Sequence, residues 1–362
     1  MTDTVHFAEA LLPSGWAGGV RLHLADGLVR RIETGAAPHP GEPSHATALP
    51  GLPNLHSHAF QRGMAGLAEQ RGQNADSFWT WRETMYRFVD RLTPDDMAVI
   101  AAMAYAEMLE SGFTRVGEFH YLHHDPHGAP YHGAAMAGAI AAAAQESGIA
   151  LTLLPVFYAH SGFGGLEPGA GQRRFVCSLD RFAALRDDSA AALKVLPDAV
   201  LGLAPHSLRA VTPDQLCALT EMAGSAPIHI HAAEQIAEVE ACLAWSGQRP
   251  VEWLLGHAPI GRNWCLVHAT HMTAEETRAL AQSGAVAGLC PITEANLGDG
   301  LFRAADYLAA GGRFGVGSDS NVMIDAGEEL RWLEYGQRLS AQSRNVFAAG
   351  PGGSTGAALF GG

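Results

Sequence analysis

Short apolar runs alternate with longer amphipathic or alanine-rich segments along the chain from Leu49 onward. Brief runs rich in β-branched residues predict buried strands, and the longer segments between them have the spacing of helices. The predicted strands are Gly51–His58, Thr114–His120, Ala150–Tyr158, Ala199–Ser207, Pro227–His231, Trp264–Thr270, Ala285–Thr293 and Arg313–Ser320. The clearest predicted helices are Pro94–Ser111, Ala134–Ser147, Pro213–Ala223, Ile236–Trp245 and Ala274–Ser283.

Strands that alternate with helices predict a parallel sheet, so the expected fold class is α/β. Eight strands suit a closed (β/α)8 barrel, with a doubly wound open sheet as the alternative. In a barrel the catalytic side chains lie at the carboxyl ends of the strands. Polar residues stand at these ends here, namely His56, His58, Glu118, His120, His206, His231, His268 and Asp319. This placement favours the barrel.

The first 48 residues have a different pattern. VRLHLADGLVRRIE consists of two alternating runs around Asp26-Gly27, which predicts a β-hairpin. A link rich in Pro, His and Gly follows, AAPHPGEPSHA. We therefore predict a small β domain over 1–48, the barrel over 49–345 and a C-terminal segment over 346–362.

Composition restricts the possible partners. The 362 residues carry a formal net charge of −14, which disfavours nucleic acid and anionic membranes because both need a basic surface. The five cysteines are scattered without a CxxC pair, so neither a disulfide framework nor a cysteine zinc site is predicted. The N-terminus lacks a signal-peptide pattern, and no apolar run reaches the ~18 residues of a membrane span. We expect a cytoplasmic enzyme.

Leu55-His56-Ser57-His58 places two imidazoles at i and i+2, on one face of a strand. Alone, such a pair is more often a polar strand end than a metal site. His231 and Asp319 also end predicted strands, and three imidazoles with one carboxylate are ligands that a divalent cation prefers, zinc above all. The sequence therefore predicts that these four residues hold a metal, with water at the open position.

Several other polar residues have a simpler interpretation. His229 shares the face of His231 but lies one layer deeper, which predicts a structural role. The loop 121–127 (YLHHDPH) lacks the spacing of a ligand set, so a solvated or substrate-facing loop is favoured over a second metal site. GFGGLEPGAG lacks the Lys-Ser/Thr ending of a phosphate loop, and we expect a mobile lid there. Arg173 and Arg174, just beyond it, are expected to be solvated.

The ordered set of HxH, HxxE, a strand-end His and SD resembles the amidohydrolase superfamily, in its metal-dependent deaminase branch. More narrowly, several segments are similar to the formimidoylglutamate deiminase family: GLPNLHSHAFQRGMAG, SFWTWRETMYRF, GEFHYLHHDP, GFGG with GQRRF, and LAPHSLRAV. The similarity extends from Leu49 to Gly336, and the tryptophan-arginine block is its most specific part.

This resemblance implies hydrolytic deimination of N-formimino-L-glutamate to N-formyl-L-glutamate and ammonia, a step of histidine degradation. It also implies a β-sandwich domain built from both chain ends, whose C-terminal half we expect to be missing because the sequence stops at AALFGG. Binuclear relatives bridge their metals with a carboxylated lysine, but Lys194, the only lysine, precedes the fourth strand. We therefore expect one metal, with Zn²⁺ favoured over iron, manganese or nickel.

The catalytic roles follow from residue type, placement and the superfamily pattern. Glu234, three residues past His231, is predicted to be the proton shuttle to the departing nitrogen, the alternative being an ordinary acid at a helix N-terminus. His268 and Asp319 are expected to take the proton of the attacking water or to orient it. Asp319 also holds the metal.

A chain with a net charge of −14 would repel an anionic substrate unless arginines stand at the binding site. A guanidinium clamps a carboxylate through two parallel hydrogen bonds, so Arg82 and Arg209 suit the two carboxylates of a glutamate. By resemblance, the substrate contacts are Gln61, Arg82, Tyr121, His206 and Arg209. Without it, Arg82 would be an ordinary surface helix residue and Gln61 a helix-start residue.

Two other functions compete with this one. A deaminase of a nucleobase or another aminated heterocycle would use the same metal chemistry but would favour stacking over arginine clamps. A metal-binding scaffold without catalysis would not need Glu234 and His268. The expected partners are thus a small anionic substrate and a second copy of the chain, a homodimer being the default.

Overall fold

The computed structural model describes residues 3–69, 78–348 and 352–361. The chain divides into two compact units, Met1–Leu52 and Pro53–Gly362. Among the described residues, no helix combines the length and apolar character that crossing a bilayer requires.

The N-terminal unit contains a four-stranded sheet in the order β3-β2-β1-β4, with β1 at Asp3–Leu12, β2 at Gly15–Ala25, β3 at Leu28–Glu33 and β4 at Ser44–Ala48. The predicted hairpin is confirmed, because β2 and β3 pair antiparallel. Asp26 (φ 53°) and Gly27 (φ 72°) both adopt the left-handed conformation that a two-residue hairpin turn requires. Buried Arg21 contacts Glu33 and Glu42 and so ties this hairpin to the link that follows it.

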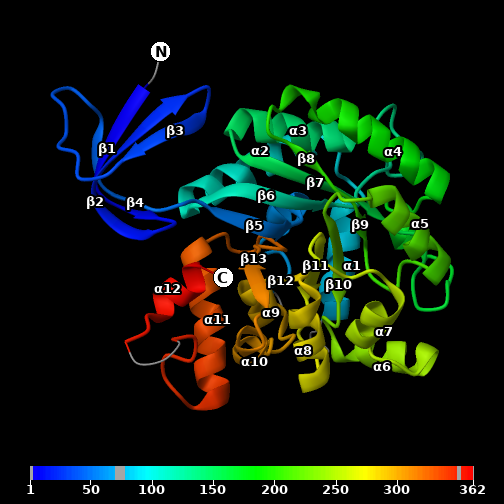
Figure 1. The fold of residues 1–362 in the computed structure, drawn as a ribbon. Coiled ribbons are helices and arrows are strands. Elements are labelled where there is room, and N and C mark those ends of the chain that lie inside the picture. The colour runs from blue at the N-terminus through cyan, green and yellow to red at the C-terminus, as the bar shows by residue number, and fades with distance from the viewer. Residues whose placement is uncertain (1–2, 70–77, 349–351, 362) are drawn as a thin grey trace. The chain divides into compact units, whose positions relative to one another are not determined.

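The second unit contains parallel strands in two sheets (Figure 1), β5-β6-β7-β8 with β9 on β7, and β10-β11-β12-β13. Their bounds are β5 Leu52–Ser57, β6 Phe113–His120, β7 Ala150–Phe157, β8 Val200–Leu201, β9 Ala204–Pro205, β10 Ile228–Ala232, β11 Trp264–His268, β12 Val286–Leu289 and β13 Arg313–Val316. Parallel bridges join the sheets at both seams, Leu203 to Ile228 and Ser207 to His231 at one, Ser57 to Asp319 at the other. The sheets thus close on each other, as a (β/α)8 barrel requires and an open doubly wound sheet does not.

Helices follow the strands and cover the barrel from outside (Figure 1). Their bounds are η1 Ala59–Met64, α1 Phe78–Val89, α2 Pro94–Ser111, α3 Ala135–Ser147, η2 Ala170–Gln172, α4 Leu179–Ala192, η3 Leu193–Val195, α5 Pro213–Ala223, α6 Ile236–Ser246, α7 Pro250–His257, α8 Ala274–Ser283, α9 Pro291–Leu297, α10 Ala304–Ala309, α11 Ala326–Ala341 and α12 Thr355–Phe360. All five predicted helices are present. Thr93, Thr212 and Thr273 begin capping boxes at the N-termini of α2, α5 and α8. Such a motif spans only a few residues, so the sequence alone predicts where these helices begin.

Three predicted strands are shorter or broken in the structure. Strand Ala199–Ser207 divides into β8 and β9 around Gly202. A Cβ atom at position 202 would lie only 2.5 Å from the Pro227 carbonyl oxygen, so the site requires glycine. Strand Ala285–Thr293 ends at Leu289, because Pro291 begins α9. Strand Arg313–Ser320 ends at Val316, and the chain then turns so that Asp319 enters the barrel mouth.

Lys194 lies in η3, before β8 begins. The predicted site residues instead follow the carboxyl ends of their strands, so Lys194 belongs to the opposite end of the barrel.

Candidate metal centre and active site

Four side chains from three different segments converge at the carboxyl end of the barrel. One ligand atom each of His56, His58, His231 and Asp319 lies within 4.8 Å of the other three, and all four residues are buried. The Nε2 atom of His56 is 3.2 Å from that of His58 and 3.0 Å from that of His231. The Asp319 carboxylate is 3.3 Å from His56 Nε2 and 3.2 Å from His58 Nε2. Ligands about 2.0–2.1 Å from zinc in a tetrahedron lie roughly 3.3 Å apart, so the spacing fits such a cation.

Hydrogen bonds on the far side of two rings fix which nitrogen faces the centre. His58 Nδ1–H donates to the Phe119 carbonyl at 2.9 Å, and His231 Nδ1–H donates to the His206 carbonyl at 3.0 Å. Each ring therefore presents the lone pair of its Nε2 atom. Burial lowers the pKa of His56 to about 3 and that of His231 well below its usual value, so both imidazoles are neutral. Neutral lone pairs facing one another need a cation between them, so the donor set fits a divalent metal.

A buried polar network links the strand of the two histidines to the segment of Asp319. Asn54 Oδ1 accepts the backbone N–H groups of His56 and Ser318, both at 3.2 Å. Asn321 Nδ2 donates to the carbonyls of His58 (3.0 Å) and Asp319 (3.2 Å). These asparagines therefore fix Asp319 relative to the histidines. Sequence reasoning missed both, although they lie within three residues of the predicted ligands.

Three residues at the site adopt left-handed backbone conformations that non-glycine residues rarely populate. They are Ala233 (φ 52°), His268 (φ 66°) and Asp319 (φ 45°). Glu238 stabilises the first by accepting the backbone N–H groups of Ala233 and Glu234, each at 3.2 Å. The chain thus bends sharply just past β10 and β11, which turns Glu234 and His268 back over the barrel mouth.

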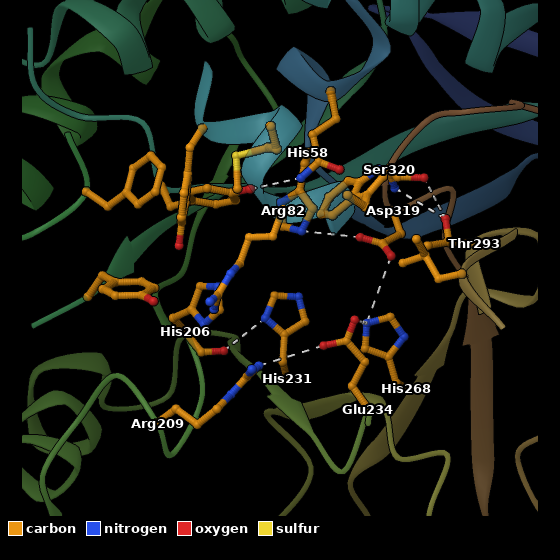
Figure 2. Close-up of a pocket in the computed structure, with 18 of the residues that line it drawn as sticks. His58, Arg82, His206, Arg209, His231, Glu234, His268, Thr293, Asp319 and Ser320 are labelled. Carbon is orange, nitrogen blue, oxygen red and sulfur yellow. Dashed lines mark hydrogen bonds and ion pairs between the residues drawn. The ribbon is translucent and has the colours of Figure 1, made fainter. Parts of the chain in front are cut away.

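Glu234 and His268 lie beside the four-residue centre (Figure 2). His268 Nε2 is 3.8 Å from Glu234 Oε1 and 3.9 Å from Asp319 Oδ2, and its Nδ1 contacts Glu294 at 3.3 Å. Burial lowers the pKa of His268, but the surrounding carboxylates, Glu234 first, raise it to about 10. Burial raises the pKa of Glu234. Both pKa values are therefore raised, which favours the protonated forms of two adjacent groups beside the metal ligands, as delivery of a proton requires.

The predicted substrate contacts line the same cavity. Gln61, Arg82, Tyr121, His206 and Arg209 all border it together with His58, His231, Glu234, His268 and Asp319. Gln61 Nε2 donates to the Tyr121 hydroxyl at 2.8 Å, and Arg209 Nη2 is 3.8 Å from Glu234 Oε2. Figure 2 shows the Arg82 side chain directed toward His206 and the Arg209 side chain directed toward Glu234. The structure thus brings every predicted site residue except His56 to the lining of one cavity, and His56 belongs to the ligand group with three of them. Their individual roles stay predictions.

The cavity has further lining residues that sequence reasoning did not single out. They are mostly aromatic or hydroxyl-bearing: Trp81, Met85, Tyr86, Tyr158, Ser161, Phe175, Thr293, Leu297 and Ser320. Tyr158 directly follows β7, so its place at a strand end was a usable signal.

The expectation that Arg173 and Arg174 are solvated is wrong for Arg174, whereas the Arg173 side chain stays 35% exposed. The Arg174 side chain is fully buried, and its guanidinium donates to the carbonyls of Val89, Leu92 (2.8 Å) and His124 (2.8 Å). Arg173 pairs with Asp90 at 2.7 Å. Carbonyls at the carboxyl end of a helix lack partners within the helix and attract cations, so both arginines hold the end of α1.

The histidines of loop 121–127 differ from expectation as well. His123 and His124 are buried, and they donate to the carbonyls of Val156 (2.8 Å) and Val176 (2.9 Å), respectively. Neither belongs to a metal-compatible group among the described residues. The first part of the loop is thus packed, with Tyr121 lining the cavity, whereas His127 at its end is exposed. His229 is also buried and stands outside the four-residue centre, as a structural role predicts.

The chain belongs to the amidohydrolase family, whose model matches residues 47–349, and residues 2–46 match the N-terminal domain of formimidoylglutamate deiminase HutF. It is 53% identical to the formimidoylglutamate deiminase of Pseudomonas aeruginosa, over 94% of this chain and 76% of that protein. It is 30% identical to an 8-oxoguanine deaminase of the same species, over 89% of this chain and 72% of that one.

Solved structures agree with this assignment. An amidohydrolase from Brucella melitensis superposes with a TM-score of 0.96 at 58% identity, covering 99% of this chain and 80% of that one. A zinc-bound adenosine deaminase from Xanthomonas campestris shares the fold, with a TM-score of 0.75 at 19% identity and the same two coverages.

Proposed function

We propose that this chain hydrolyses N-formimino-L-glutamate to N-formyl-L-glutamate and ammonia, a step of histidine degradation. The observation that carries the proposal is one cavity lined by a His/Asp ligand group, an acid–base pair and two arginines. The similarity to formimidoylglutamate deiminase over 94% of the chain supports the same substrate.

His56, His58, His231 and Asp319 would hold one divalent cation, with zinc favoured by three nitrogens and one oxygen in tetrahedral spacing. Such a cation, when bound, lowers the pKa of water and supplies a nucleophile at neutral pH. A second, lysine-bridged cation is not expected, because Lys194 precedes β8 at the other end of the barrel.

The protein's own groups move the protons. Asp319 accepts the proton of the attacking water. His268, whose Nε2 lies 3.9 Å from the Asp319 carboxylate and whose pKa of about 10 keeps it protonated, orients that water. Water adds to the amidine carbon, and the bond from that carbon to the terminal nitrogen then breaks. Glu234 delivers the proton with which this nitrogen leaves as ammonia, and burial, which raises the pKa of Glu234, favours its protonated form.

Arg82 and Arg209 would bind the two carboxylates of the substrate, with Gln61, Tyr121 and His206 as further contacts. Arg209 lies 3.8 Å from Glu234, so a carboxylate bound to Arg209 would sit close to the general acid. This spacing suits a short dianionic amidine.

Deamination of an aminated heterocycle is the second candidate, favoured by the 30% identity to an 8-oxoguanine deaminase and by the aromatic lining of the cavity. Ammonia release should be measured with formiminoglutamate, formiminoaspartate, guanine and cytosine derivatives, with metal content determined on the same samples. Turnover of a nucleobase without turnover of formiminoglutamate would overturn the proposal, and no turnover of any substrate would leave the scaffold alternative. The metal analysis separates zinc from iron, manganese and nickel.

We further propose a homodimer in the cytoplasm, for which sedimentation measures the oligomeric state. The N-terminal sheet is proposed to be one layer of a β-sandwich. Exposed apolar residues on β2 and β3, Trp16, Leu28, Val29 and Ile32, support a covering layer.

A further inference from the structure

The hydroxyl of Tyr158 occupies a polar position in the cavity that the substrate contacts above do not include. Tyr158 follows β7 at the carboxyl end of the barrel, is 8% exposed and lines the cavity together with Arg82 and Arg209. Its ring packs against His206 with centroids 4.7 Å apart, so the phenol is held in place. Burial raises the pKa of Tyr158, while the charges of Arg209 and Arg82 act in the opposite direction. The phenol thus stays protonated at neutral pH, with both cations close enough to influence it.

A chain of directional hydrogen bonds determines where the phenolic proton points. The backbone N–H of Gly169 donates to Gln172 Oε1 at 2.7 Å, which fixes the orientation of this amide. Gln172 Nε2 therefore faces Tyr158 and donates to its hydroxyl oxygen at 2.6 Å. An amide nitrogen carries only donors, so the phenolic oxygen is the acceptor in this bond and its proton is directed elsewhere. Gln172 is buried, so the arrangement is shielded from water.

We propose that Tyr158 donates a hydrogen bond to a substrate carboxylate in the cavity that Arg82 and Arg209 line, with Gln172 as the residue that orients the hydroxyl. This inference rests on the proposed function for the identity of the anion. Tyr158 supplies a neutral third donor beside two guanidiniums, and a neutral donor adds directionality without further charge. It favours a carboxylate because that group accepts several hydrogen bonds at once.

The first test replaces Tyr158 with Phe, which removes the donor and keeps the ring. We expect kcat/KM for formiminoglutamate to fall about 10- to 100-fold, mainly through KM, as for a lost hydrogen bond to a charged group. Binding of N-formyl-L-glutamate, measured by calorimetry, should weaken by a similar factor. Turnover of N-methylformamidine, which has no carboxylate, should change less than about twofold. Tyr335→Phe, on the exposed part of α11, is the matched control.

The second test is a double-mutant cycle with Gln172→Met, which leaves the hydroxyl present but free to rotate. Gln172→Met alone should raise KM less than Tyr158→Phe does, and the two changes together should cost less than their product. The double variant also removes the unpaired amide that Tyr158→Phe alone would leave. It therefore provides the measurement if the single variant folds poorly.

Three outcomes would overturn the inference. They are unchanged KM and N-formylglutamate binding in Tyr158→Phe, an equal loss with N-methylformamidine, and a loss confined to kcat. If the unmodified protein releases no ammonia from formiminoglutamate, yet Tyr158→Phe still weakens N-formylglutamate binding, the proposed function fails while the carboxylate contact stands.

Discussion

The four metal ligands, which we call the metal wall of the cavity, stand on barrel strands or are tied to one by backbone hydrogen bonds, whereas the two substrate arginines, Arg82 and Arg209, which we call the substrate wall, stand on segments beyond the strands. His56, His58 and His231 belong to β5, its end and β10, and backbone bonds tie Asp319 to β5. Arg82 instead belongs to α1, which the buried guanidinium of Arg174 holds by its last carbonyls. The metal wall is therefore positioned by the barrel strands. On the substrate wall, Arg82 is positioned by Arg174, whose side chain binds backbone carbonyls at the end of α1.

This difference suggests a division of roles, in which the reaction centre on the strands is common to a large family and the residues beyond the strands set the substrate of each member. The barrel lets many relatives keep one reaction centre, and loops beyond the strands can change while that centre stays intact. If this interpretation is correct, damage to the metal wall removes chemistry, and damage to the substrate wall weakens recognition of the dianion. Five substitutions test it, in order of decreasing effect.

Asp319→Ala should have the largest effect, because it removes a ligand and a proton acceptor together. We expect ammonia release to fall by at least about 10⁴-fold, with loss of bound metal. Metal content and kcat measure both effects, and Asp306→Ala on the surface of α10 should change neither. Full metal retention with normal turnover would contradict the assignment.

Glu234→Gln should lower kcat by about 10²- to 10⁴-fold, since the amide cannot deliver a proton to the departing nitrogen. Bound metal should not change, because Glu234 lies outside the four-residue group. Metal lost in parallel with activity would instead make Glu234 a ligand.

Arg209→Met acts on the other wall. We expect kcat/KM for formiminoglutamate to fall about 10²- to 10³-fold, as two charge-assisted hydrogen bonds are lost. Steady-state kinetics with formiminoglutamate measures this. Nearly intact activity would favour the heterocycle deaminase.

Asn321→Ala removes the amide that bridges the His58 and Asp319 carbonyls. Metal affinity should weaken about 10- to 100-fold, the range for a residue that orients ligands. Chelator competition measures this loss. Asn263→Ala is the control, because this amide also donates to carbonyls but precedes β11 at the opposite barrel end.

Arg174→Met should leave kcat nearly unchanged and raise KM about 10-fold, because α1 and with it Arg82 would lose a fixed position. Unpaired buried carbonyls should also lower the free energy of unfolding by about 3 kcal/mol. Kinetics and denaturant unfolding measure the two effects, with Arg278→Met on the exposed face of α8 as control. A drop in kcat at constant KM would assign Arg174 to the metal wall.

Local sequence patterns determined the elements and the chemistry of the metal wall. Capping boxes at Thr93, Thr212 and Thr273 mark helix starts through bonds that span three residues, so these boundaries are readable without the fold. The pair His56 and His58 shares a strand face because of a two-residue period. Recognition of Arg82 and Arg209 as substrate contacts came from resemblance to a family, since neither residue stands in a periodic pattern.

Tertiary structure alone decided which polar groups are buried and against what. From the sequence, Arg174 looks like an ordinary loop residue. In the structure its guanidinium donates to the carbonyls of Leu92 and His124, which are 82 and 50 positions away. Leu92 lies just past the end of α1, where carbonyls have no partner within a helix. His268 adopts a left-handed conformation, which is uncommon for any residue other than glycine. The direction of the Tyr158 hydroxyl depends on an amide 14 positions further on. Sequence by itself determined the ligand types and their strands, because those follow from short-range periodicity. Only the fold decided the orientation of each donor, because the hydrogen bonds that orient it join segments distant in the sequence.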